Sequence, residues 1–270
     1  MTEIQVKRNF MFIDECGAPN FYGSGHKLLV GQSGYQSFLI IGLISTENRK
    51  ALRKKVAGFM ESIKRDPLYN SIPSIKNTQG WYLHAKDDHP EVRAKFFEFI
   101  RSIEGFRTFI VIGRKKLDIF SKKHNNSPTE FYFDLLHHLL KDRLNKEGIE
   151  YQIYLSQRGK NNMQFFQKAI EKALELDNTR RKKAIVVKFK CDIVLSNQYP
   201  ELSIVDYLLW ALQRYILKGE DRFFMALRDK YNLIIDLYDT EHYKGKEKEN
   251  TNYYTKQNPF DVKKASNFDK

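Results

Sequence analysis

Two acidic residues near opposite ends of the chain have the surroundings of metal ligands. Asp14 ends the short apolar run 10–13, where a buried strand is expected to stop, although a surface acid in a turn is the alternative. Asp206 interrupts the apolar segment 202–212, where a carboxylate is costly to bury without a metal ion or a partner such as Arg214, unless it faces solvent. Mg²⁺ prefers carboxylate oxygens. Hydrolysis of a phosphodiester bond by two metal ions needs several such groups to converge.

The charge balance of the chain favours a polyanionic partner. The 46 Lys and Arg residues exceed the 33 Asp and Glu residues by 13, and nucleic acid is the commonest partner of such a basic protein. The basic run 180–183 could follow a phosphate backbone, although a solvated connection between a helix and a strand is the alternative. The predicted nucleic-acid-binding residues are Arg158, Lys160, Arg180, Arg181, Lys182 and Lys183.

Other chemistries fit the sequence less well. Cys16 and Cys191 form neither a disulfide framework nor a zinc ligand set by themselves, and Cys16 as a nucleophile would need a nearby base. His137 and His138 are adjacent on a predicted helix, where two neighbouring positions do not easily share a metal. The segment Asp261-Val262-Lys263 matches an acid-x-Lys nuclease motif but lies in a polar region instead of on a strand.

The elements that must position these residues predict a mixed α/β sheet with helices on its faces. Apolar runs that end at turn residues indicate five strands, and helical periodicity follows or separates them. The expected strands are 10–13, 38–44, 106–112, 151–155 and 184–189, with an extension of the last to Ile193 left open and a further possible strand at 233–237. The main expected helices are 47–65, 90–104, 162–176 and 201–217, and one that follows Ser127-Pro128-Thr129 and ends at Gly148. The segment between the second and third strands forms a helical and loop insertion.

Residues 1–240 are expected to form one domain, and the polar residues 241–270 a flexible tail. Hydrophobic residues make up 41% of the chain and aromatic residues 14%, which excludes a disordered or collagen-like protein. No stretch approaches the ~20 apolar residues of a membrane span, and the amino-terminal residues have no apolar signal core. A cytoplasmic protein without membrane contacts is therefore expected.

The two acidic motifs resemble those of the bacterial family called domain of unknown function 3800. Its opening strand ends in Asp-Glu-Ser-Gly, similar to residues 12–17, and its late helix reads approximately Leu-Gln-Leu-Ala-Asp-Leu-Ile-Ala-Trp-Ala, similar to residues 202–211. The element order matches over about residues 9–218. The resemblance implies a ribonuclease H-like fold, with the first three of five strands antiparallel and Asp14 near the centre of the sheet. It also implies that Asp14 and Asp206 hold Mg²⁺ or Mn²⁺.

This chain departs from the family pattern at two places. Ser156 stands where members usually have an Asp after the fourth strand, and a hydroxyl is a poor substitute for that ligand. Asp192, near the end of the fifth strand, could compensate, whereas Glu15 belongs to the motif but points to the other face of its strand. Where the family often has an acid-x-Lys pair, His84 could orient a water or contact a scissile phosphate and Lys86 could neutralise one, or both belong to a polar loop.

These expectations lead to two alternative functions. The first is a metal-dependent nuclease acting on DNA or RNA, in phage defence or mobile-element biology. The second is a catalytically impaired nucleic-acid-binding or assembly subunit, with a protein partner or a second copy of the chain. The predicted catalytic residues are Asp14, Asp206, Asp192, Glu15, His84 and Lys86, and the predicted metal ligands are Asp14, Asp206 and Asp192.

Overall fold

The computed structural model describes residues 7–76, 80–158, 162–181, 186–239 and 252–268. They contain a mixed seven-stranded sheet with the strand order β5-β4-β1-β2-β3-β6-β7. The first three strands run antiparallel, β4 and β5 continue parallel to β1, β6 is parallel to β3, and β7 is antiparallel to β6. The strands are β1 (Lys7–Cys16), β2 (Phe38–Thr46), β3 (Arg107–Arg114), β4 (Ile149–Ser156), β5 (Lys188–Val194), β6 (Tyr231–Leu237) and β7 (Tyr253–Thr255).

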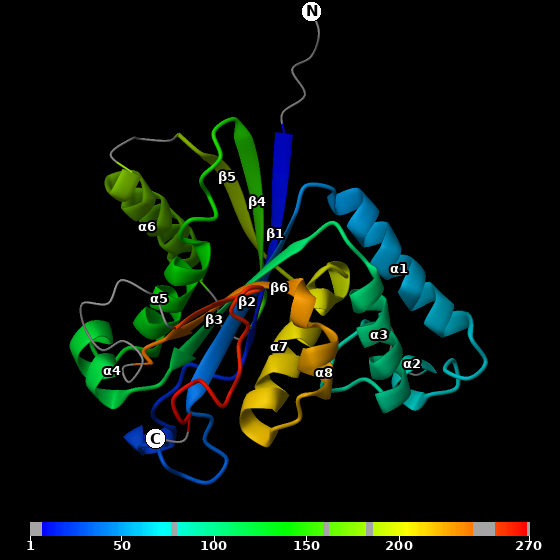
Figure 1. The fold of residues 1–270 in the computed structure, drawn as a ribbon, viewed down its shortest axis with the longest axis horizontal. Coiled ribbons are helices and arrows are strands. Elements are labelled where there is room, and N and C mark those ends of the chain that lie inside the picture. Colours follow the sequence, from blue (N-terminus) through cyan, green and yellow to red (C-terminus); the bar gives the residue numbers. More distant parts are fainter. Residues whose placement is uncertain (1–6, 77–79, 159–161, 182–185, 240–251, 269–270) are drawn as a thin grey trace, which may run out of the picture.

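Helices cover both faces of the sheet (Figure 1). One face carries α1 (Arg49–Arg65), α2 (Pro73–Lys76), α3 (Pro90–Ser102), α7 (Leu202–Lys218) and α8 (Arg222–Ala226). The other face carries α4 (Leu117–His124), α5 (Pro128–Leu140) and α6 (Met163–Arg181). Short 3₁₀ turns occur at Ser24–His26, Ser196–Gln198 and Arg228–Lys230. Each helical layer encloses its own hydrophobic core against the sheet.

The alternation of side chains along β1 decides which core each residue joins. Phe12 belongs to the core under α7, whereas Met11 and Ile13 belong to the core under α5 and α6. Because successive side chains of a strand point to opposite faces, Asp14 points to the α7 side and Glu15 to the α5 side. β2 is buried along its whole length beside β1, so Asp14 lies near the middle of the sheet, as the family resemblance implies.

The five expected strands are present, but the prediction of a five-stranded sheet is wrong. β6 and β7 extend the sheet beyond β3; the segment 233–237 reads as a strand, but its sequence does not give its partner. The fifth strand begins at Lys188 instead of Ala184, and residues 184 and 185 lie outside the described part of the chain. α4 was not expected. Among the described residues, no helix has both the length and the apolar character of a membrane span.

The carboxyl-terminal residues 252–268 pack on the molecule, which contradicts the expectation of a flexible tail over this range. β7 pairs with β6, and the side chains of Phe260 and Phe268 are buried. Buried Arg114 donates to the Asp236 carboxylate and to backbone carbonyls of Ser266 and Asn267. Polar side chains of this segment also bond to the sheet, because the Asn252 amide donates to the carbonyl of Asp236.

Candidate active site

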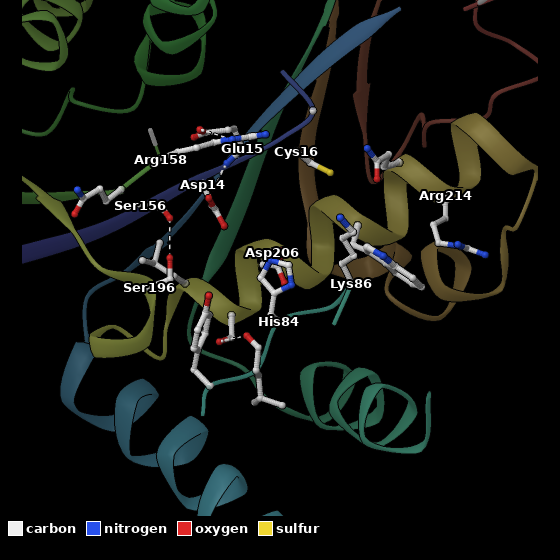
Figure 2. Close-up of a pocket in the computed structure, with 18 of the residues that line it drawn as sticks. Asp14, Glu15, Cys16, His84, Lys86, Ser156, Arg158, Ser196, Asp206 and Arg214 are labelled. Carbon is white, nitrogen blue, oxygen red and sulfur yellow. Dashed lines mark hydrogen bonds and ion pairs between the residues drawn. The ribbon is translucent and has the colours of Figure 1, made fainter. Parts of the chain in front are cut away.

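A cavity of about 610 Å³ opens at the carboxyl end of β1, between the sheet and α7 (Figure 2). Five segments provide its walls: the end of β1, the loop 82–86, the end of β4, Ser196 in the turn after β5, and one face of α7. Asp14 and Asp206 both line it, although 192 positions separate them in the chain. The structure thus brings together the two acids that the sequence singles out.

Asp14 has one carboxylate oxygen committed to the backbone. Its Oδ1 accepts a hydrogen bond from the amide of Glu15 at 2.9 Å. The nearby Ser156 hydroxyl acts to lower the pKa of Asp14, and it lies 2.8 Å from the Ser196 hydroxyl. Ser156 therefore lies in the surroundings of Asp14 and adds no charge there.

Asp206 lies in α7, and one of its carboxylate oxygens is likewise bound by a backbone amide. Oδ2 accepts a hydrogen bond from the amide of Ala85 at 2.6 Å, and Oδ1 lies 4.0 Å from Nε2 of His84. The other ring nitrogen of His84, Nδ1, lies 3.2 Å from a carboxylate oxygen of Asp87. His84 is therefore held between an outer acid and the acid in the cavity.

The loop that carries His84 is fixed to α7 on both sides of Asp206. Ser203 donates to the carbonyl of Leu83 at 2.8 Å, and the Tyr207 hydroxyl donates to Asp88 at 2.5 Å. Asp88 also accepts from the amide of His84 at 2.9 Å. Since Ser203, Asp206 and Tyr207 occupy adjacent turns of one helix face, α7 and this loop form one unit.

Gly42 allows α7 to approach the sheet beside Asp14. Gly42 pairs with Asp14 across the β1–β2 ladder, and a Cβ atom on it would lie only 2.7 Å from Cδ2 of Leu209. Leu209 follows Asp206 by three residues, so the two side chains lie close together on the helix surface. The absence of a side chain at position 42 therefore lets Asp206 approach Asp14.

The cavity raises the pKa of its acids. Burial, followed by the charge of Asp206, raises the pKa of Asp14 to about 7. Burial, followed by the charges of Asp88 and Asp87, raises the pKa of Asp206 to about 7. Desolvated carboxylates of like charge resist ionisation unless a cation joins them. The pair therefore forms an electrostatically strained site that a bound cation would relieve.

Glu15 lies on the other side of the strand, as the alternation of side chains predicts (Figure 2). Its carboxylate accepts from the Tyr132 hydroxyl at 3.0 Å and lies 3.7 Å from Nε of Arg158. Burial and the charge of Asp14 raise the pKa of Glu15 to about 7. Glu15 and Arg158 border both the cavity of Asp14 and a second cavity under α5. The side-chain contacts of Glu15 are thus with Tyr132 and Arg158.

The structure does not bring Asp192 to the two acids. Asp192 is exposed and pairs with Tyr154, whereas Ser156, at the level of the cavity, pairs with Val194. The prediction that Asp192 compensates as a ligand is therefore wrong in this geometry. The register of β5 places Asp192 two residues before Val194, the residue that lies level with Ser156 and the cavity.

The predicted basic residues have different outcomes. His84, Lys86 and Arg158 line the cavity, and Lys86 is exposed. Arg180 and Arg181 end α6, with side chains outside the described part of the structure. Lys160, Lys182 and Lys183 lie outside the described residues.

Several residues of α7 that line the cavity were not predicted as site residues. They are Trp210, Gln213, Arg214, Leu217 and Lys218. Their spacing from Asp206 follows the helical period of about 3.6 residues, so continuing the face of Asp206 along the helix would have found them. Arg214, considered as an ion partner of Asp206, pairs instead with Glu220. Cys16 also lines the cavity, and burial raises the pKa of its thiol to about 12, which disfavours the nucleophilic thiolate.

No family model and no curated protein matches the chain. Among solved structures, it is similar to the crystal structure of ribonuclease H2 from Pyrococcus horikoshii OT3, with 13% sequence identity and a TM-score of 0.45. The match covers 83% of this chain and 80% of the other. A likeness of this extent says nothing of the activity, the ligands or the substrate of this chain.

Proposed function

We propose that the chain is a divalent-metal-dependent nuclease of ribonuclease H-like fold, related to the family of domain of unknown function 3800. The strand order and directions of β1 to β5 agree with the fold that the sequence resemblance implies. The observation that carries the proposal is the meeting of Asp14 and Asp206 in one cavity, each with a raised pKa. Perturbed acids that converge in a cleft are typical of functional sites.

The donor set fits Mg²⁺ or Mn²⁺. Oδ2 of Asp14 and Oδ1 of Asp206 are the oxygens left by the two backbone hydrogen bonds, and hard cations of this kind prefer oxygen ligands and retain several waters. Asp14 and Asp206 would hold the ion. When bound, it would lower the pKa of a water and offset charge on a phosphoryl group.

The remaining residues of the cavity have chemistry suited to a phosphodiester. Four cationic side chains from three segments line the cavity and would bind phosphate oxygens: Lys86, Arg158, Arg214 and Lys218. His84, whose Nδ1 lies 3.2 Å from a carboxylate oxygen of Asp87, would give or take a proton at Nε2. The loop contacts described above keep that nitrogen turned toward Asp206.

A cleavage assay with purified protein tests the proposal. Labelled single-stranded and double-stranded DNA, RNA and a DNA–RNA hybrid are each incubated with Mg²⁺, Mn²⁺ or EDTA. We expect cleavage that needs the metal and is lost in Asp14→Asn and in Asp206→Asn. Asp192→Asn is the matched control, because it neutralises an exposed carboxylate outside the cavity. Equal activity in EDTA, or in either cavity variant, would contradict the proposal.

The second candidate function is nucleic-acid binding without cleavage. It is favoured by one observation, the uncharged Ser156 beside Asp14, because a site with one carboxylate fewer holds metal less strongly. Salt-sensitive binding that persists in EDTA, with no cleavage under any condition, would support it. Roles in phage defence or mobile-element biology, and a protein partner or homo-oligomer, stay predictions.

A further inference from the structure

A second cluster of ligand-type side chains lies on the opposite face of the sheet, on α5. Asp134, His137 and His138 each offer one ligand atom, and these three atoms all lie within 4.8 Å of one another. The three positions are related by the i, i+3 and i+4 spacing of neighbours on a helix surface. α5 packs on the face of the sheet opposite to α7, toward which Asp14 points. This cluster is therefore separate from the cavity described above.

The two oxygens of Asp134 have different surroundings. Oδ2 accepts from Nζ of Lys123 at 2.7 Å and from the hydroxyl of Tyr238, and it lies 3.3 Å from Nε2 of His124. Oδ1 instead faces His138, with Nε2 at 3.8 Å. One oxygen thus ties α4, α5 and the end of β6 together, and the other remains available to a ligand.

His137 is the feature that normal core packing does not explain. Only 5% of this residue is exposed, and neither of its ring nitrogens has a hydrogen-bond partner among the described residues. Leaving a buried polar group unpaired costs about 1–3 kcal/mol. Its ring lies beside that of His138, with centroids 4.8 Å apart. Two adjacent imidazoles and a carboxylate oxygen therefore converge on one region, in which the ring nitrogens of His137 make no hydrogen bond to the described residues.

We propose that Asp134, His137 and His138 bind a divalent transition-metal ion of the zinc type. Two imidazoles and one carboxylate are a known ligand set for Zn²⁺, with a water in the fourth position. Bond lengths of about 2.0–2.2 Å place tetrahedral ligand atoms roughly 3.4 Å apart, so the side chains must rotate inward by about 1 Å. Adjacent positions on a helix do not easily share a metal, which counts against this pair when the sequence alone is considered. In the structure, however, one nitrogen of each ring lies within 4.8 Å of the other and of an oxygen of Asp134, one turn earlier.

The charges around the cluster set the expected strength of binding. Burial lowers the pKa of His137 and of His138 to about 4, so both rings are neutral at neutral pH and keep a lone pair. The ammonium of Lys123 offsets the charge of Asp134, and Lys141 and Lys172 also act on the histidines. The cationic surroundings reduce affinity for any metal, and imidazole nitrogens favour Zn²⁺ over Mg²⁺.

Cobalt absorption tests this site independently of the proposed nuclease. Tag-free protein carrying Asp14→Asn and Asp206→Asn, which removes both acids of the other cavity, is treated with EDTA, dialysed and titrated with Co²⁺. We expect visible d–d absorption that saturates at one equivalent, is displaced by Zn²⁺ and survives excess Mg²⁺. His137→Asn and His138→Asn should each weaken binding at least about tenfold, whereas His89→Asn, outside the cluster, should leave it unchanged.

Folding is followed separately by far-ultraviolet circular dichroism without metal. If His137→Asn fails to fold, His138→Asn decides, because the side chain of His138 is 20% exposed and less essential to packing. Absence of the cobalt band in the folded background protein would overturn the proposal. Retention of the band at full strength in folded His138→Asn would overturn it as well.

Discussion

Replacing Gly42 with alanine tests whether the close approach of α7 to the sheet positions the two acids. The new Cβ would lie 2.7 Å from Cδ2 and 3.3 Å from Cγ of Leu209, and 3.4 Å from Cγ1 of Ile110. Ordinary contact begins at 3.4 Å, so the end of the Leu209 side chain must withdraw by at least about 0.7 Å. Rotation of Cδ2 alone does not suffice, because Cγ is also too close. Leu209 is buried, which restricts repacking of its side chain, and we expect α7 to shift away from β2.

The shift has two measurable consequences. Overpacking of a core typically lowers the free energy of unfolding by about 1–3 kcal/mol. Because Asp206 precedes Leu209 by about one helical turn, the same shift moves the Asp206 carboxylate away from Asp14. A displacement near 1 Å reduces the rate of catalysis by up to about 100-fold. We therefore expect Gly42→Ala to lose both stability in urea denaturation and metal-dependent cleavage.

A double-mutant cycle separates this mechanism from a general loss of packing. Leu209→Ala alone should lower the free energy of unfolding by about 2–5 kcal/mol. In the double variant the alanine methyl at position 42 occupies space that Leu209 leaves, so the combined loss should fall short of the sum by about 1–2 kcal/mol. Gly58→Ala is the control, because position 58 lies on α1 with no atom within 4 Å of a new Cβ. Wild-type stability of Gly42→Ala, or strict additivity in the cycle, would refute the reasoning.

Three further outcomes are expected. The pKa values of Asp14 and Asp206 are raised from 3.8 to about 7 in the folded protein. Between about pH 4 and 7 the folded state therefore binds more protons than the unfolded state. The free energy of unfolding consequently falls as the pH rises across this window. In EDTA, Asp14→Asn should therefore exceed the wild type by roughly 1–4 kcal/mol at pH 8 and match it near pH 4, and equal urea midpoints at pH 8 would contradict this. Ser156→Asp should bind Mn²⁺ at least about tenfold more tightly in calorimetric titration, yet be less stable than the wild type in EDTA; unchanged affinity would argue against a metal site beside Asp14. Arg114→Met leaves Asp236 buried without its partner and should lower the free energy of unfolding by about 3–5 kcal/mol, and a loss below 1 kcal/mol would show that the ion pair does not anchor the carboxyl-terminal segment.

The parts of the fold that the sequence predicts have local causes. The strand that carries Asp14 follows from an apolar run that stops at turn residues, and α5 begins where Ser127 caps the amide of Glu130 ahead of an apolar helical face. β7 has no such signal, because three residues of a polar segment become a strand only by pairing with β6. The burial of Phe268 likewise depends on Arg114, whose guanidinium lies 3.8 Å from its ring. Contacts of this kind join distant parts of the chain and leave no periodic pattern.

The candidate site divides in the same way. Asp206 could be found from the sequence because an acid within an apolar segment carries a free-energy cost that demands an explanation. Asp14 could be found because it follows an apolar run typical of a buried strand. Asp192 could not be excluded, because its distance from the cavity depends on how β5 pairs with β4. Nor could it be foreseen that the ring of His137 has no hydrogen-bond partner among the described residues, since its burial results from the packing of α5 against the sheet.

The number of negative charges in the cavity, to which the uncharged Ser156 does not add, determines how many cations the cavity can balance. Ser156 adds no negative charge beside Asp14. The carboxylates that line the cavity are therefore Asp14, Asp206 and Glu15, and Glu15 lies 3.7 Å from Arg158. One divalent ion balances two carboxylates, whereas two-ion hydrolysis relies on a richer set of anionic ligands. Neutralising either acid should stabilise the metal-free protein, as expected where converging acids belong to a functional site. Under the proposed nuclease function, a single ion would fit the two acids, and His84 and the surrounding cations would contribute what a second ion contributes in two-metal hydrolysis.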